Sequence, residues 1–185
     1  MGRDVGGAED RTIAAHRSDD RFHHHPRASP GRRRKRGTQK QGFGRSKGGF
    51  TTKIHLCANA DGLPVCEEIT GGEVSDYKGF DLMMRDPTAL PRVLIADKGY
   101  DSDHVRDVVE RAGGIAIIPA RRTRKMPRPI DDYIYALRNR IERCFNKLKN
   151  SRRLATRYDK TAESYLGFVN LAAIRLWIRH FVNTT

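Results

Sequence analysis

The sequence predicts one mixed α/β domain, and three observations support this. The alternating, β-branched stretch Phe50–Ala58 has the two-residue period of a strand. The continuous apolar run Val93–Ala96 is typical of a short strand buried on both faces. Asp131–Leu154 has a helical period, so strands and helices both occur along the 185 residues. That length suits one domain with a hydrophobic core better than two.

The other elements follow from turn and capping signals, such as the Asp61-Gly62 turn that makes a hairpin of two strands. The resulting order of elements is strand, strand, strand, helix, strand, helix, strand, helix, helix. This order matches the ribonuclease H-like fold, which starts with a three-strand meander and continues with crossover helices. We therefore expect a mixed five-stranded sheet with flanking helices. The predicted elements are a strand near Asp10, strands Phe50–Ala58 and Pro64–Thr70, a helix from Ser75 or Asp76 to about Arg85, the buried strand Val93–Ala96, a helix from Ser102 to about Ala112, the buried strand Ile115–Ile118, and helices Asp131–Leu154 and Glu163–Phe181.

Residues 1–49 differ in composition from residues 50–185. The first part is rich in Gly and in Arg and Lys, and Arg32–Arg36 is a run of like charge that resists compact folding. We therefore expect a first strand near Asp10 followed by a basic loop over residues 17–49. Residues 50–185 would form the remainder of the same single domain.

The charge balance points to nucleic acid as the partner. Lys plus Arg is 36 and Asp plus Glu is 22, which gives a formal net charge of +14. Such an excess favours a polyanion. No apolar run approaches the ~20 residues of a membrane span, so a membrane partner is not expected. The three cysteines are scattered without a C-x-x-C pair, which fits a reducing compartment.

The predicted helix Asp131–Leu154 carries a polar face. At about 100° per residue, Tyr135, Arg138, Glu142 and Lys149 fall within an arc of about 60°. The apolar side chains of this helix occupy the adjoining arc, so Glu142 lies at the border of the buried stripe. A metal-binding carboxylate at the rim of a core would lie there. The alternative is a surface glutamate that forms weak ion pairs with its cationic neighbours.

A second candidate, Asp97, directly follows the buried strand Val93–Ala96. Functional residues of open α/β sheets gather at the carboxyl ends of strands. A carboxylate at the end of an apolar run must meet solvent, a cation or a metal ion. The alternative is an ordinary turn or helix cap at Asp97. Asp101 is a more plausible helix cap than metal ligand.

Taken together, these motifs resemble the DDE transposases of bacterial insertion sequences, and more narrowly the insertion sequence four and five superfamily. The resemblance covers roughly residues 10–180. Its strongest parts are the pattern Tyr135-x2-Arg138-x3-Glu142-x6-Lys149 and the string ADKGYDS at residues 96–102. Further matching strings are GRSKGGFTTKIH at 44–55, SDY at 75–77, IPARR at 118–122 and ATRYDKT at 155–161.

The resemblance implies three acidic residues that bind Mg²⁺ or Mn²⁺, and the chemistry of the reaction favours two ions. Asp97 and Glu142 match the second and third of them. For the first, Asp10 is the best match, although the segment Asp10–His16 is one residue shorter than the family's pattern. Glu9 and Asp4 are the fallbacks. Carboxylate oxygens suit hard divalent cations, and two such ions can activate an attacking oxygen and stabilise the leaving one.

The implied function is metal-dependent DNA cleavage and strand transfer. Tyr135, Arg138, Lys149, Arg121 and Arg122 would bind DNA phosphates, and the partners would be the element's ends and the target DNA. The family also implies a homo-oligomer on DNA in the bacterial cytoplasm, associated with the nucleoid.

Two alternatives stay open at the level of sequence. One is another ribonuclease H-like nuclease, such as a junction resolvase. The other is a truncated, inactive remnant that still binds DNA, because the family's usual N-terminal portion for end recognition is not found before Asp10. An upstream reading frame could supply that portion as a separate product.

Overall fold

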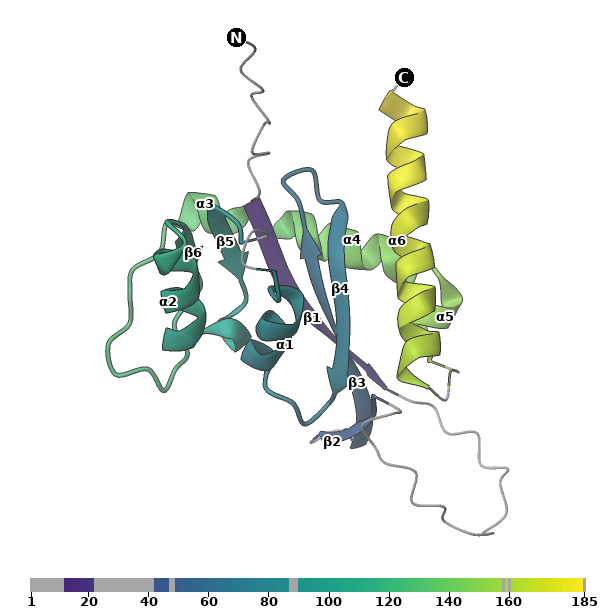
Figure 1. Ribbon diagram of the computed structural model, residues 1–185, viewed down its shortest axis with the longest axis horizontal. Helices are drawn as coiled ribbons and strands as arrows, with labels where there is room; N and C mark the ends of the chain where they lie inside the picture. The colour runs from purple at the N-terminus through teal and green to yellow at the C-terminus, as the bar shows by residue number, and fades with distance from the viewer. Residues whose placement is uncertain are drawn as a thin grey trace.

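A computed structural model describes residues 12–21, 42–46, 49–86, 90–157, 159 and 161–184. The centre of the fold is a six-stranded sheet, with the order β2-β3-β1-β5-β6 and with β4 on β3 (Figure 1). The strands are β1 Thr12–Arg21, β2 Gly44–Ser46, β3 Gly49–Ala58, β4 Pro64–Gly71, β5 Val93–Ala96 and β6 Ile115–Ile117. The helices are α1 Asp76–Met83, the 3₁₀ helix η3 Lys98–Tyr100, α2 Asp103–Arg111, α3 Asp132–Ala136, α4 Asn139–Lys149, α5 Arg152–Ala155 and α6 Ala162–Thr184.

The sheet is mixed. Strands β1, β3 and β4 form an antiparallel meander, whereas β5 runs parallel to β1 and β6 runs parallel to β5. The prediction of a mixed α/β fold is therefore confirmed. The predicted count of five strands is wrong, because the short strand β2 adds a sixth by pairing with the start of β3. Its three residues, Gly44–Ser46, lack the alternating pattern by which the longer strands are found.

The β3–β4 hairpin forms where the Asp61-Gly62 signal predicts it. The Asn59 side chain accepts hydrogen bonds from the backbone amides of Asp61 and Leu63, at 3.1 and 2.9 Å. Gly62 has a φ of +75°, which side-chain-bearing residues rarely adopt. The turn is thus fixed by one side chain and one glycine.

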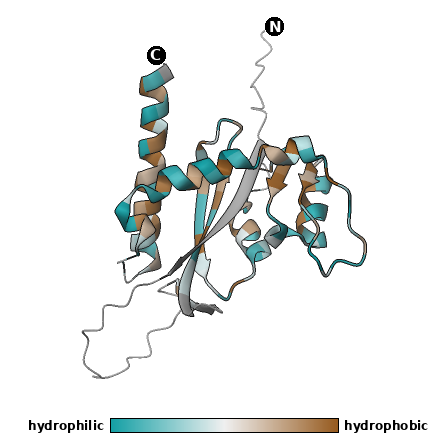
Figure 2. Ribbon diagram, turned by 180° about the vertical axis from the view of Figure 1, so that it is seen from behind, coloured by the Kyte–Doolittle hydropathy of each residue, from teal (hydrophilic) through white to brown (hydrophobic). Residues whose placement is uncertain are grey.

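Helices cover both faces of the sheet, and each layer has its own core. On one face Ile54, Leu56 and Ile95 pack against α4, α5 and α6. On the other face Cys57 and Leu94 pack against α1 and α2. Figure 2, which shows the molecule from behind, has α4 running across the near face of the sheet and the long helix α6 standing at its side. The result is a three-layer α/β sandwich. Among the described helices, none has the length and apolarity needed to cross a membrane.

Three details of the predicted elements need correction. The basic loop expected over residues 17–49 is wrong at both ends, because backbone pairing extends β1 to Arg21, and β2 and the first residue of β3 lie before Phe50. The single helix expected over Asp131–Leu154 consists of α3, α4 and α5, because the backbone tightens at Leu137 and Arg138 into i→i−3 hydrogen bonds and becomes extended at Ser151. Ile115 is 60% exposed, so the strand predicted to be buried on both faces is buried in part only. The reason is that β6 lies at the edge of the sheet, with β5 as its only neighbour among the described strands.

Candidate active site

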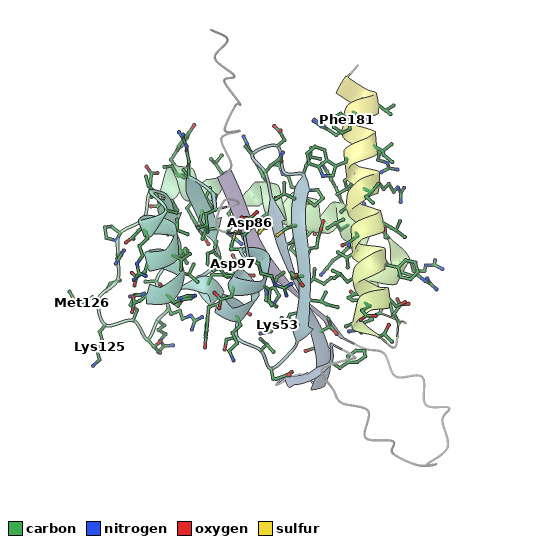
Figure 3. All side chains as sticks on the ribbon, in the orientation of Figure 1. Lys53, Asp86, Asp97, Lys125, Met126 and Phe181 are labelled. Atoms are coloured by element: carbon green, nitrogen blue, oxygen red, sulfur yellow. The ribbon has the colours of Figure 1, made fainter. Side chains whose placement is uncertain are left out.

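Asp97 lies where the sheet meets the loops. The buried strand β5 ends at Ala96 and η3 begins at Lys98, so the Asp97 backbone joins the two. Its side chain is 22% exposed and is labelled near the middle of the molecule in Figure 3. The apolar run thus delivers a carboxylate to the carboxyl end of a parallel strand.

Glu142 approaches Asp97 from the helical layer. It lies in the first turn of α4, next to the buried residues Ile141 and Cys144 that anchor this helix on the sheet. Arg138, which precedes α4, lies one turn before Glu142 and on the same side of the helix. The tightened turn before α4 therefore places an arginine beside both carboxylates.

One guanidinium group links the two acidic residues. Arg138 Nη1 donates to Asp97 Oδ1 at 2.6 Å, and Arg138 Nη2 forms an ion pair with Glu142 Oε1 at 2.8 Å. Since both bonds start from one planar fork, the two carboxylate oxygens lie within about 8 Å of each other. Burial opposes the charged form of Arg138, but the neighbouring carboxylates and Tyr135 outweigh it and raise its pKa. The structure thus brings Asp97 and Glu142 together around a cation.

Tyr135 and Lys149 occupy the two ends of the same polar face. The Tyr135 ring centroid lies 5.4 Å from the guanidinium carbon of Arg138. Burial, together with the charges of Asp97 and Glu142, raises the pKa of Tyr135 despite the opposing effect of Arg138. Lys149 is half-buried at the end of α4, about 10 Å along the helix from Glu142. Tyr135 therefore belongs to the cluster, whereas Lys149 flanks it.

Arg121 and Arg122, both predicted to bind phosphate, differ in what they contact. The Arg121 guanidinium donates to the backbone oxygens of Lys98 and Gly99, with a distance of 3.0 Å for Lys98. Arg121 therefore fastens its loop to the η3 turn that follows Asp97. Arg122 is exposed on the same loop.

Sequence reasoning missed the role of Asp101, which was expected to cap a helix. Ser102 caps α2 instead, accepting from the Val105 amide at 3.2 Å. The buried Asp101 carboxylate accepts from Arg106 at 2.9 Å and Arg124 at 3.0 Å, and from the Arg121 amide at 2.8 Å.

These bonds have an electrostatic consequence. Burial alone would raise the pKa of Asp101, but the bonds from Arg124, the Arg121 amide and Arg106 lower it to about 2. The hint in the sequence was Arg106, a charged residue on the face of α2 that also buries Val105 and Val109.

A buried polar network supports the η3 turn from behind. His55 Nδ1 lies 2.9 Å from the Tyr100 hydroxyl, and His55 Nε2 lies 2.9 Å from the Thr70 hydroxyl. A Cβ atom on Gly79 would collide with the His55 ring, so α1 can pack here only with glycine at this position. Tyr100 ends η3, and the network therefore fixes the turn that begins just after Asp97.

A second buried pair lies beside this network. Lys53 Nζ donates to Asp76 Oδ1 at 3.0 Å and to the Val74 oxygen at 2.6 Å. A Cβ atom on Gly99 would collide with the Asp76 carboxylate. Hence the strings around Lys53, Asp76 and Gly99, which carry the family resemblance, meet in one place.

The first acidic residue, Asp10, lies outside the described residues, as do Glu9 and Asp4. Backbone pairing places Ala15 of β1 beside Ala96 of β5, so His16 is level with Asp97 in the parallel register. Within the described part of the chain, no three His, Cys, Asp or Glu side chains form a metal-binding group. The described site therefore consists of two carboxylates and their shared arginine.

Comparison with known proteins identifies the family. The family model described as "Transposase DDE domain" matches residues 9–177, which is most of the chain. The chain belongs to this family. It is therefore a transposase of the DDE class, an enzyme type that cleaves and joins DNA, and neither of the two alternative functions is favoured.

Two relatives agree with this family. A Brucella ovis protein, assigned as the transposase of insertion sequence element IS6501, is 37% identical over 131 residues, which are 70% of this chain and 100% of that protein. A Burkholderia cepacia protein, assigned to insertion sequence element IS402, is 29% identical over 131 residues, which are 65% of this chain and 59% of that longer protein.

Proposed function

We propose that this transposase cleaves DNA at the ends of an insertion sequence and joins them to target DNA, using Mg²⁺ or Mn²⁺. Asp97, Glu142 and Asp10 would hold these ions. Two ions are expected, because in-line displacement at a phosphate uses one ion for the attacking oxygen and one for the leaving oxygen. The observation that carries the proposal is the pairing of Asp97 and Glu142 with one guanidinium cation. We also propose a ribonuclease H-like fold, supported by the antiparallel meander β4-β3-β1 followed by parallel β5 and β6.

The residues present fit a divalent cation. The two carboxylates offer the hard oxygen donors that Mg²⁺ and Mn²⁺ prefer, and both remain partly open, with exposures of 22% and 41%. A positively charged group already lies between them, so the space and the local charge suit a cation. When bound, the metal would lower the pKa of a bound oxygen nucleophile and neutralise charge on the scissile phosphate.

The other polar residues would orient the DNA. Tyr135, Arg138 and Lys149 would contact phosphates along one face of α4, and the exposed Arg122 would do so from its loop. Arg121 has a different task, since it fastens this loop to the backbone beyond Asp97. Phosphate contacts of this kind fix the position of a duplex without reading its sequence.

We further propose that the protein acts as a homo-oligomer on DNA. Support comes from an exposed apolar stripe on α6, whose members follow each other at intervals of three, four and three residues. Its members are Leu171, Ile174, Ile178 and Phe181, between 53% and 62% exposed. Such spacing is that of the contact positions in paired helices.

Plasmid cleavage tests the central proposal. Supercoiled plasmid carrying the element's ends should be nicked in Mg²⁺ and left intact in EDTA, and labelled cut ends should then appear joined to target DNA. Asp97→Asn and Asp10→Asn should each abolish cleavage. Asp19→Asn and Asp20→Asn are the matched controls for Asp10, since these carboxylates also belong to the β1 region. Normal cleavage by Asp10→Asn with loss in Asp19→Asn or Asp20→Asn would reassign the first acidic residue.

A further inference from the structure

A basic groove lies apart from the candidate active site, between α4, the β3–β4 turn and the C-terminal half of α6. It consists of two adjoining hollows of about 340 and 320 Å³, which share Asp61, Gly62 and Lys147 in their walls. Arg143 also lines one hollow, and Arg179 lines the other. Arg140 lines the second hollow as well, so four cationic side chains of α4 and α6 face the same depression.

The walls of this groove are held in place by direct contacts. The Arg140 guanidinium donates to the backbone oxygen of Ala60, which ties α4 to the β3–β4 turn. At Gly62 the two backbones approach so closely that a Cβ atom would lie 3.2 Å from the Arg140 oxygen. On the other side, Trp177 Nε1 donates to the Pro64 oxygen at 2.7 Å and ties α6 to the hairpin. The groove is thus preformed.

Its cations are not neutralised from within the described structure. Arg143, Lys147 and Arg179 are exposed and form no ion pair with a described residue. The one carboxylate in the lining is Asp61. By contrast, Arg124 and Arg128 of the loop after β6 pair with Asp101, Asp103 and Glu110.

The groove and the active site lie on different faces of α4. Arg143 and Lys147 project about 100–140° around the helix axis from Glu142. They are one turn apart on the helix, or about 5–6 Å between Cβ atoms. Phosphates of one DNA strand advance by about 3.4 Å per nucleotide along the duplex axis, so these two long side chains can reach phosphates that are one or two nucleotides apart.

We propose that this groove binds the phosphate backbone of duplex DNA outside the active site. The inference rests on the proposed function in that the chain acts on DNA. Contact is with phosphates rather than bases, because the described lining offers long cationic side chains in a shallow hollow and no element that enters a DNA groove. A duplex held at the active-site face of α4 would gain a second anchor here.

Salt dependence of DNA binding tests this proposal. The triple variant Arg143→Ala, Lys147→Ala, Arg179→Ala is compared with a matched triple, Arg85→Ala, Arg92→Ala, Arg111→Ala, which removes the same charge from exposed sites outside the groove. Binding to a 30-base-pair duplex is measured by fluorescence anisotropy in EDTA over a range of salt concentrations. The groove variant should lower the log–log slope by about 2.7, at ~0.9 per lost phosphate contact. The matched variant should change it by less than about 1.

Two further measurements keep the result unambiguous. Arg143→Lys with Arg179→Lys keeps the charge and should keep the slope, while circular dichroism checks the fold of every variant. Equal slopes for the groove and matched triples would overturn the proposal, as would a loss of slope in the lysine variant. Cleavage by the wild-type protein in Mg²⁺ tests the proposed function separately, because binding in EDTA requires no catalysis.

Discussion

Replacing Arg138 with glutamine should tighten the binding of Mn²⁺ to the DNA-free protein, although this residue lies inside the candidate site. In the free protein its guanidinium donates to Asp97 at 2.6 Å and forms an ion pair with Glu142 at 2.8 Å. A metal ion that binds both carboxylates must displace this internal cation. Glutamine keeps a polar side chain but removes the positive charge, so both carboxylates become available to the metal.

The expected size of the effect follows from the two bonds. A hydrogen bond to a charged group contributes about 1.5–3 kcal/mol when well buried, and exposed ion pairs contribute less than about 1 kcal/mol. With Asp97 22% and Glu142 41% exposed, each bond falls toward the lower range. A total of about 1–2 kcal/mol corresponds to about 5- to 30-fold tighter binding of Mn²⁺. Without metal, the variant should lose a similar amount of stability, because two nearby carboxylates then lack a counter-ion.

The assay titrates Mn²⁺ into the protein without DNA and follows free Mn²⁺ by electron paramagnetic resonance. Arg111→Gln is the matched control, since Arg111 pairs with the surface carboxylate of Asp107 at 3.9 Å and its loss changes the net charge equally. The control should bind Mn²⁺ as the wild type does. Thermal unfolding with and without Mn²⁺ should show the larger metal-induced gain in Arg138→Gln. Equal or weaker Mn²⁺ binding by Arg138→Gln would refute the reasoning, because Arg138 would then hold the carboxylates in a metal-ready arrangement rather than compete.

Three other predictions concern single residues. Glu142→Gln should stay folded but lower Mg²⁺-dependent plasmid cleavage by several orders of magnitude, since a metal ligand is lost; normal cleavage would end the assignment of Glu142. Asp101→Ala should cost about 3–5 kcal/mol in urea unfolding, because it leaves the buried Arg106 charge unpaired, and an unchanged midpoint would contradict this. Burial raises the pKa of Glu67 to about 7, so the stability that this group contributes is full below about pH 4.5 and is lost as pH rises through 7. Glu67→Gln should therefore reduce the fall in unfolding free energy between pH 5 and pH 8 by about 1–2 kcal/mol. A variant with the same pH profile as the wild type would show that burial does not raise the pKa of Glu67.

The strands were the most predictable part of the fold. The run Val93–Ala96 has the limits of β5, and Pro64–Thr70 differs from β4 by one residue. Local pattern was sufficient here because alternation and apolar runs determine which side chains a strand can bury. The helix signal of Asp131–Leu154 was also correct in type. It could not show the tightened turn at Arg138, since this depends on hydrogen-bond partners and not on period.

The candidate site could be proposed from the sequence where one segment carried the signal. Asp97 followed from its position after a buried strand, and Glu142 from its position at the edge of an apolar stripe. The shared cation was not predictable, because Arg138 and Asp97 are 41 residues apart and meet only through the fold. For the same reason the sequence suggested Asp101 as a helix cap, whereas three-dimensional packing surrounds it with cationic partners.

A net charge of +14 does not show which arginines are available to DNA, and burial decides this. Arg157 is 1% exposed, stacks on the Tyr165 ring at 4.7 Å from its centroid, and has its pKa lowered by burial to about 10. It supports the core, as Arg106 does beside Asp101. Arg138 pairs with two carboxylates that a metal ion could bind instead. Its availability to DNA phosphate therefore depends on whether a metal ion occupies the site. Arg143 has no carboxylate partner among the described residues, and its charge is available to phosphate from the start. A variant series that removes one arginine of each kind should therefore separate losses of stability, of metal binding and of DNA affinity.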